Sequence, residues 1–307
     1  MKEDFQIDAE YPKILDNNDP LGQFRQRFYL KEDQIYMCGN SLGLATKDAE
    51  KCVLEVLEKW KEYGIKIWTV EDNKYYLYSK NLAELMAPIV GCDPDELSVW
   101  GGTTINIHQG ISTFYKPTKD KYKILVDNIN FPTDRYAVDR SSAALYINRK
   151  HFKLLPGLAG WYGNKIETQF LLRQEFDHQK NANEGALRVV NEAGVPNMRK
   201  KSLHITAYLM YLIENKLSNY GFTIGNLRED SKRGGHVCLE HDEGYRISIT
   251  LKARGVVQDF REPNVIRLTP TALYTSYQEV YKIVDILLDI VKTESYKSIG
   301  NNRNYVV

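Results

Sequence analysis

The sequence has almost no excess of charge of either sign, since 41 Lys and Arg residues face 40 Asp and Glu residues. A chain without a net field has no general attraction for nucleic acid or for an acidic membrane. It also lacks a long apolar run, because the one near Leu287 is interrupted by Asp285 and Asp289. The first residues, MKEDFQIDAEYPK, are too polar for a signal peptide. We therefore expect a cytoplasmic protein that binds neither nucleic acid nor membrane.

Cysteine is scarce, and several enzyme signatures are missing. No two cysteines have CxxC spacing, which indicates reduced thiols at Cys38, Cys52, Cys92 and Cys238. His236 and His241 flank one of them, but no second group completes four zinc ligands, so we expect no metal. The chain contains no GxSxG elbow, no P-loop and no HExxH pair.

Helix and strand patterns alternate along the chain. Apolar residues recur at helical spacing over residues 48–63, 77–86, 201–220, 242–254 and 277–291. Short strands are indicated at IYM (35–37), HVCLE (236–240) and VIRLTP (265–270), and the continuous apolar run at 124–126 is typical of a strand buried in a parallel sheet. The arm before residue 34 has no sustained period and is expected to lie on the surface. This alternation predicts an α/β protein.

Three short motifs carry residue types suited to a flat, phosphorylated ligand. GNSLGL has two glycines around Ser41, which suits a close approach to a ligand or a plain turn. GGTTIN places Thr103 and Thr104 at a helix start, where they hold a phosphate or simply cap the helix. FPTD sets Phe131 and Asp134 at a strand end, a ring and a carboxylate at the edge where open α/β sheets bind ligands.

Two further motifs concern single residues. Trp161 lies in the glycine-rich stretch LPGLAGWYGN, where it packs or offers its N–H to a ligand. Arg267 lies inside the strand NVIRLTP between apolar neighbours, where a guanidinium is rare unless it is paired. It is either a clamp for a carboxylate or one partner of a structural ion pair.

Taken in order, six stretches resemble kynureninase along most of the chain: IYMCGNSLGL, GGTTINIH, INFPTDRYA, INRKHFKLLPGLAGWYG, KRGGHVCLEH and FREPNVIRLTPTALYTSY. The resemblance implies a homodimeric enzyme of the aspartate aminotransferase-like fold that uses pyridoxal 5'-phosphate (PLP). It also implies hydrolysis of kynurenine to anthranilate and alanine, in tryptophan catabolism and NAD biosynthesis. The implied organisation is a PLP-binding large domain over residues 1–200 and a small α/β domain over 201–307.

The resemblance assigns the cofactor-binding roles residue by residue. Thr103 and Thr104 are expected to hold the cofactor phosphate. Phe131 is expected to stack on the pyridine ring, and Asp134 to help position it. Trp161 is expected to line the phosphate and substrate side.

On the substrate side, the resemblance assigns Ser41 to the substrate pocket and Arg267 to the amino-acid carboxylate. By the resemblance, the chain departs from the family at three separate positions. Asn164 replaces the histidine that usually follows GWxG, and Ile65 stands where a substrate-side histidine is expected. Asn183 is only a weak counterpart of an Asn-Pro-Pro motif.

The largest departure is a missing stretch. In the family, the segment between the FPTD strand and the INRKHF strand carries the aspartate facing the pyridine nitrogen and the lysine that forms the Schiff base. Here it has collapsed to VDRSSAAL, so we expect an internal deletion near residues 139–144, a second departure near 170–185, and an incomplete large domain. Without that lysine, the imine with the cofactor has no matching residue.

Three interpretations stay open. A kynureninase-type hydrolase recruits another lysine, such as Lys150, Lys153 or Lys165 near the deletion. Alternatively, the chain is a non-catalytic homologue that acts at most as a PLP-binding or dimer-partner protein. The third is another member of the PLP fold, such as a cysteine desulfurase, against which the FREPNVIRLTPTALYTSY stretch argues.

Overall fold

The computed structural model describes residues 4–99, 103–120, 122 and 178–300. The chain forms two compact units, Met1–Lys51 with Gly185–Val307 (unit 1) and Cys52–Glu184 (unit 2). Several predicted features lie outside the described residues: Phe131, Asp134, Trp161, the strand at 124–126, the deletion near 139–144, and Lys150, Lys153 and Lys165. The domain boundary expected near residue 200 stays a prediction.

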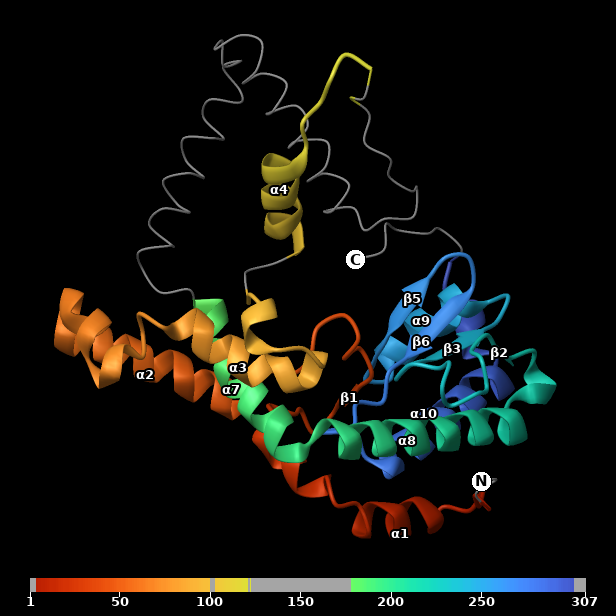
Figure 1. The fold of residues 1–307 in the computed structure, drawn as a ribbon. Helices are drawn as coiled ribbons and strands as arrows, with labels where there is room; N and C mark the ends of the chain where they lie inside the picture. Colours follow the sequence, from red (N-terminus) through yellow and green to blue (C-terminus); the bar gives the residue numbers. More distant parts are fainter. Residues whose placement is uncertain (1–3, 100–102, 121, 123–177, 301–307) are drawn as a thin grey trace. The chain divides into compact units, whose positions relative to one another are not determined.

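Unit 1 contains a four-stranded antiparallel sheet (Figure 1). Its order is β2 (Thr223–Ile224), β3 (Val237–Glu240), β6 (Val265–Leu268) and β5 (Asp259–Arg261). Val237, Leu239, Ile266 and Leu268 are fully buried on one face, whereas Cys238 and Arg267 alternate with them and face the other way. The strands predicted at HVCLE and VIRLTP are thus confirmed. A parallel pair, β1 (Ile35–Tyr36) with β4 (Val256–Val257), completes the strands of this unit in the described residues.

Three helices pack with that sheet: the first two contact its strands, and the third packs against those two helices. They are α8 (Val195–Lys216), α9 (Gly244–Ala253) and α10 (Tyr277–Lys292). The periodic residues of the sequence supply the core: Ile205, Leu209, Leu212, Ile247, Leu251, Val280, Ile283, Val284 and Leu287. α10 begins with a capping box, in which Ser276 and Glu279 satisfy each other's backbone N–H. α8 begins earlier than its period predicts, because Pro196 is well suited to a helix's first turn.

The N-terminal arm is packed more deeply than its missing periodicity predicts. It forms α1 (Tyr11–Asn17) and a 3-10 helix (Gly22–Arg27), and Leu21 and Phe24 are buried. Asp16 caps α10 by accepting hydrogen bonds from the backbone N–H groups of Tyr277 (2.7 Å) and Gln278 (3.1 Å). A carboxylate at a helix N-terminus also meets the positive end of the helix dipole. Long-range polar contacts therefore order a segment that has no hydrophobic period.

Unit 2 is built from helices in its described part. α2 (Lys47–Tyr63) begins in unit 1 and continues into unit 2, and α7 (His178–Ala193) returns the chain to unit 1. Between them lie α3 (Tyr78–Val90) and α4 (Thr103–Phe114). Short 3-10 helices are found at Gly64–Thr69, Glu71–Asn73 and Pro94–Glu96. The helices predicted at 48–63 and 77–86 are confirmed. Tyr78 donates a buried hydrogen bond to Glu184 at 2.6 Å, which ties α3 to α7. None of the helices in the described ranges is long and apolar enough to cross a membrane.

We predict that Lys201→Met destabilises unit 1 by about 3–5 kcal/mol, because it leaves a buried carboxylate without its cation. The Lys201 ammonium lies 2.6 Å from Asp19, and the two side chains are only 7% and 4% exposed. Urea unfolding followed by circular dichroism measures the loss. Lys61→Met is the control, because Lys61 and its partner Glu58 are both exposed and should lose less than about 1 kcal/mol. Equal losses in the two variants would contradict the prediction.

Candidate active site

A cavity of about 400 Å³ lies in unit 1, where three of the sequence motifs meet. CGNSLGL contributes Gly39 and Asn40, and KRGGH contributes Gly235 and His236. The remaining lining residues come from the first turns of α8 and from the segment after β6: Val195, Met198, Arg199, Ser202, Thr269, Pro270, Thr271 and Ala272. Segments that are far apart in the sequence thus form one concave surface.

The loop that carries Ser41 is fastened to the end of the strand that carries Arg267. The backbone N–H of Thr269 donates to Met37 at 2.9 Å, and the Thr269 hydroxyl donates to Asn40 Oδ1 at 2.8 Å. The Ser41 N–H donates to the Cys38 carbonyl at 3.0 Å, which closes the loop as a turn. Ser41 is exposed and follows cavity-lining Asn40 in the chain. The predicted substrate-side serine is thus next to a lining residue in the chain but is not itself among the residues that line this cavity.

Gly39 is needed in this loop for close approach. A Cβ atom there would lie 2.3 Å from Thr271 Oγ1 and 2.5 Å from the Tyr274 hydroxyl, which is closer than any real contact. The Thr271 and Tyr274 hydroxyls can occupy these positions because residue 39 has no side chain.

Arg233 holds the opposite wall and was not singled out by the sequence. Its buried guanidinium donates to Asp230 Oδ1 at 2.7 and 3.0 Å and to the Leu203 carbonyl of α8 at 2.8 Å. It also bonds the Thr206 hydroxyl. These contacts fix the turn that presents Gly235 and His236 to the cavity. The only signal in the sequence was the position of this arginine just before two glycines.

Arg267 lies on the outward face of the sheet and is 23% exposed. Its Nη2 donates to Asp259 Oδ2 on the neighbouring strand, so the structural ion pair expected as one interpretation is present. Its Nε is buried and has no hydrogen-bond partner in the chain. A buried donor without a partner loses its hydration, a cost of about 1–3 kcal/mol. An incoming oxygen anion would remove that cost.

The two groups nearest to Arg267 on β3 and the turn before it are neutral. Burial, and secondarily the positive charge of Arg267, lowers the pKa of His236 below its ordinary value. Burial also raises the pKa of the Cys238 thiol, which outweighs the opposing effect of Arg267. Cys238 stands directly opposite Arg267 in the β3–β6 register. Among the described residues, no group of three His, Cys, Asp or Glu is placed to hold a metal ion.

The described residues do not complete a PLP site. Thr103 and Thr104 form the first turn of α4, as predicted, which supplies backbone N–H groups suited to a phosphate. Phe131, Asp134 and Trp161, assigned to the ring and its surroundings, lie outside the described residues. No lysine matches the motif that forms the imine. We therefore derive no reaction step through the cofactor.

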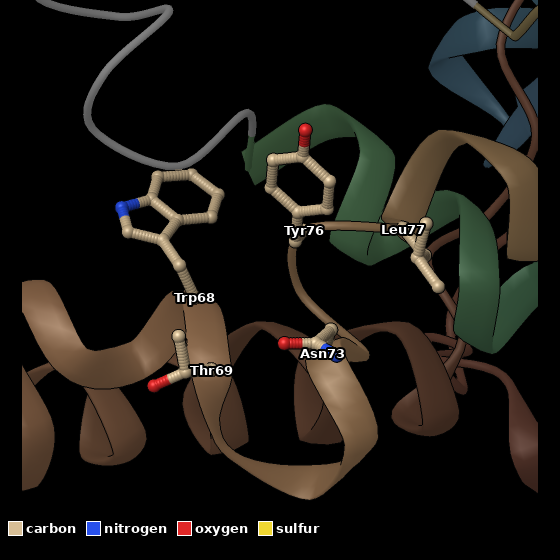
Figure 2. Close-up of a pocket in the computed structure, with 5 residues that line it drawn as sticks. All are labelled: Trp68, Thr69, Asn73, Tyr76 and Leu77. Carbon is tan, nitrogen blue, oxygen red and sulfur yellow. The ribbon is translucent and has the colours of Figure 1, made fainter.

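A second hollow, of about 840 Å³, lies in unit 2. Its lining is mostly aromatic and apolar: Trp68, Thr69, Asn73, Tyr76 and Leu77. Figure 2 shows the rings of Trp68 and Tyr76 projecting in the same direction above Thr69 and Asn73. Ile65, which replaces an expected histidine, is exposed in the same 3-10 turn as Trp68. No periodic pattern marks these residues, so sequence reasoning missed the hollow.

Comparisons with known proteins identify the family of the chain. The kynureninase C-terminal domain family matches residues 198–287, which include the KRGGH turn and Arg267. Kynureninase from Bacillus anthracis is 35% identical over 425 residues, covering 99% of each chain. Kynureninase from Geobacillus thermodenitrificans is 34% identical over 417 residues, covering 97% of each. The chain belongs to the kynureninase family.

The same alignments confirm the internal deletion. The one with the Bacillus anthracis enzyme spans 425 positions and covers 99% of both partners, whereas this chain has 307 residues. More than a hundred positions of the relative therefore have no counterpart inside this chain. The placement of the deletion near residues 139–144, with a second departure near 170–185, stays a prediction.

We predict that Gly39→Ala destabilises the chain by about 1–3 kcal/mol, the usual range for overpacking a filled site. The matched control is Gly43→Ala in the same loop, because a Cβ atom at residue 43 meets nothing within 4 Å. Urea unfolding midpoints of the two variants and the original chain measure the difference. If both variants unfold at the same concentration, the loop is not packed as described.

Proposed function

We propose that this chain is a kynureninase-type, PLP-dependent hydrolase by descent, in the aspartate aminotransferase-like fold with a truncated large domain. The family reaction converts L-kynurenine, or its 3-hydroxy form, into L-alanine and anthranilate or 3-hydroxyanthranilate. We propose that the protein belongs to tryptophan catabolism and NAD biosynthesis and acts in the cytoplasm. The observation that carries the proposal is Arg267, whose buried Nε has no hydrogen-bond partner and which lies two residues before cavity-lining Thr269.

The amino-acid end of kynurenine fits this arginine. A carboxylate accepts two parallel hydrogen bonds from a guanidinium, and such charge-assisted bonds are among the strongest that a site makes. The Nε donor that the chain leaves unused would supply one of them. Ser41, which follows cavity-lining Asn40 in the CGNSLGL loop, would meet the substrate. Thr103 and Thr104 would hold the cofactor phosphate, with Phe131 on its ring and Asp134 and Trp161 around it.

The deletion favours a second role, as a non-catalytic homologue. A positioned proton-transfer group is worth about 10²- to 10⁴-fold in rate, and this chain has no counterpart of the lysine that supplies it. We propose that the chain keeps recognition of the substrate carboxylate and has lost efficient turnover. Binding and turnover therefore need separate measurements.

A homodimer is proposed as the assembly. It is supported by large apolar side chains exposed around the hollow of unit 2, with Ile65 81% and Tyr76 74% exposed. Exposed apolar patches of this kind mark sites of protein association. Sedimentation equilibrium of the purified chain measures the assembly directly.

We predict that Arg267→Met weakens binding of L-kynurenine about 10- to 100-fold, since a hydrogen bond to a charged group is worth about 1.5–3 kcal/mol. Isothermal titration of the purified chain measures the affinity. Kynuramine, which lacks the carboxylate, should bind the original chain and the variant equally weakly. Arg254→Met is the matched control, because Arg254 belongs to an exposed surface pair with Asp289. Equal affinity of all three chains for L-kynurenine would contradict the proposed role.

We predict that incubation with PLP, reduction with borohydride and peptide mass spectrometry show no dominant pyridoxyl-lysine. The reason is that no lysine occupies the position of the imine-forming residue. Formation of anthranilate from L-kynurenine, followed by its fluorescence, should stay at the level of a blank without protein. One dominant labelled lysine together with measurable turnover would instead establish a working hydrolase and identify its replacement lysine.

A further inference from the structure

We infer that Asp259 is a positioning residue for Arg267, whose guanidinium it holds in place, and that Arg261 keeps the site positively charged. The inference rests on the proposed function, because it concerns the arginine that is proposed to bind the substrate carboxylate. Neither residue is among those that the sequence singled out.

The strand register places the three side chains together. Asp259 on β5 stands opposite Arg267 on β6, and Arg261 follows two residues along on the same strand. Side chains two residues apart in a strand emerge on the same face. Asp259 Oδ2 accepts a bond from Arg267 Nη2 and lies 3.3 Å from Arg261 Nε. A single carboxylate oxygen therefore bridges two guanidinium groups.

The charges of this group leave one positive charge for a ligand. An isolated pair of Asp259 with Arg267 would be neutral and would attract a carboxylate only weakly. Arg261 shares the same carboxylate, so the three residues together carry a net charge of +1. His236 and Cys238, on the neighbouring turn and strand, add no charge because burial favours their neutral forms.

The burial of the group explains how it orients Arg267. The Asp259 side chain is only 10% exposed, whereas Arg261 is 45% exposed. Because the Asp259 carboxylate is little hydrated, its ion pairs with the two arginines are strong. Its bond with Nη2 fixes one side of the planar Arg267 guanidinium. Arginine carries about 2 kcal/mol of rotamer entropy when free, so fixing it beforehand lowers the entropy lost on binding. The unpartnered Nε of Arg267 is then a donor that remains for the ligand.

A purely electrostatic role and a positioning role predict opposite results for Asp259→Ala. Removing the carboxylate raises the positive charge of the site, so charge alone predicts tighter binding of L-kynurenine. Loss of positioning predicts weaker binding, by about two- to tenfold, since ordering one such side chain costs about 0.5–1.5 kcal/mol. We expect the weaker binding, measured by isothermal titration, with urea midpoints showing that the variant is folded.

Arg261 is expected to act through charge. Arg261→Met should weaken L-kynurenine about two- to fivefold, the range of a partly exposed ion-pair contribution, and leave kynuramine unchanged. Arg261→Lys keeps the charge and should restore the affinity. Equal L-kynurenine affinity of Arg261→Met and the original chain would overturn this part of the inference.

A readout without ligand separates the inference from the proposed function. With ¹⁵N-labelled arginine, the Arg267 Nε–H signal is assigned by its loss in Arg267→Lys. It should exchange slowly with water in the original chain and rapidly in Asp259→Ala. An unchanged signal in Asp259→Ala would overturn the inference, as would L-kynurenine binding that is equal or tighter. Rapid exchange in Asp259→Ala without any L-kynurenine binding by the original chain would support the positioning and refute the proposed carboxylate site.

Discussion

The binding site proposed in unit 1 depends on the guanidinium of Arg267, which is held on the outward face of a sheet and keeps its positive charge. Strand alternation sends the neighbours of Arg267 into the core, so its own side chain must face outward. There it is too little hydrated to stand alone, and Asp259 supplies the compensating charge. Two segments of unit 1 form walls of the cavity. The loop after β1 is attached to the end of β6, and the turn before β3 is attached to α8.

Two walls of the cavity, one at Gly39 and one at Arg233, are fixed by different kinds of contact. On one side, the absence of a side chain at Gly39 lets two loops touch. On the other, the buried Arg233 uses several donors on backbone and side-chain acceptors, so the turn before His236 has little freedom. Neither Gly39 nor Arg233 adds a charged group to the lining of the cavity. The cavity lining itself includes the guanidinium of Arg199, which donates to the backbone carbonyls of Asp230 and Arg233, so the anion-binding role of Arg267 stays a proposal.

Local periodicity was enough to predict the helices over 48–63 and 277–291 and the strands at HVCLE and VIRLTP, because these elements bury one regular face. The helix start at Thr103 was also predictable from its hydroxyls. The packing of the arm was not, since it depends on contacts between Asp16 or Asp19 and residues far along the chain. The ion pair of Arg267 was foreseen as a possibility, but its partner Asp259 was not. The missing lysine was visible only through the family pattern.

Unit 1 is assembled from two stretches of chain, Met1–Lys51 and Gly185–Val307, so everything between them is a loop whose ends must meet. The entropy of closing a loop changes only logarithmically with its length, by about 0.6 kcal/mol for each halving. If the deletion lies in that loop, as proposed, shortening it makes closure slightly easier and removes no contact within unit 1. The deletion would then have little effect on the stability of unit 1, so selection for the folding of unit 1 would not act against it.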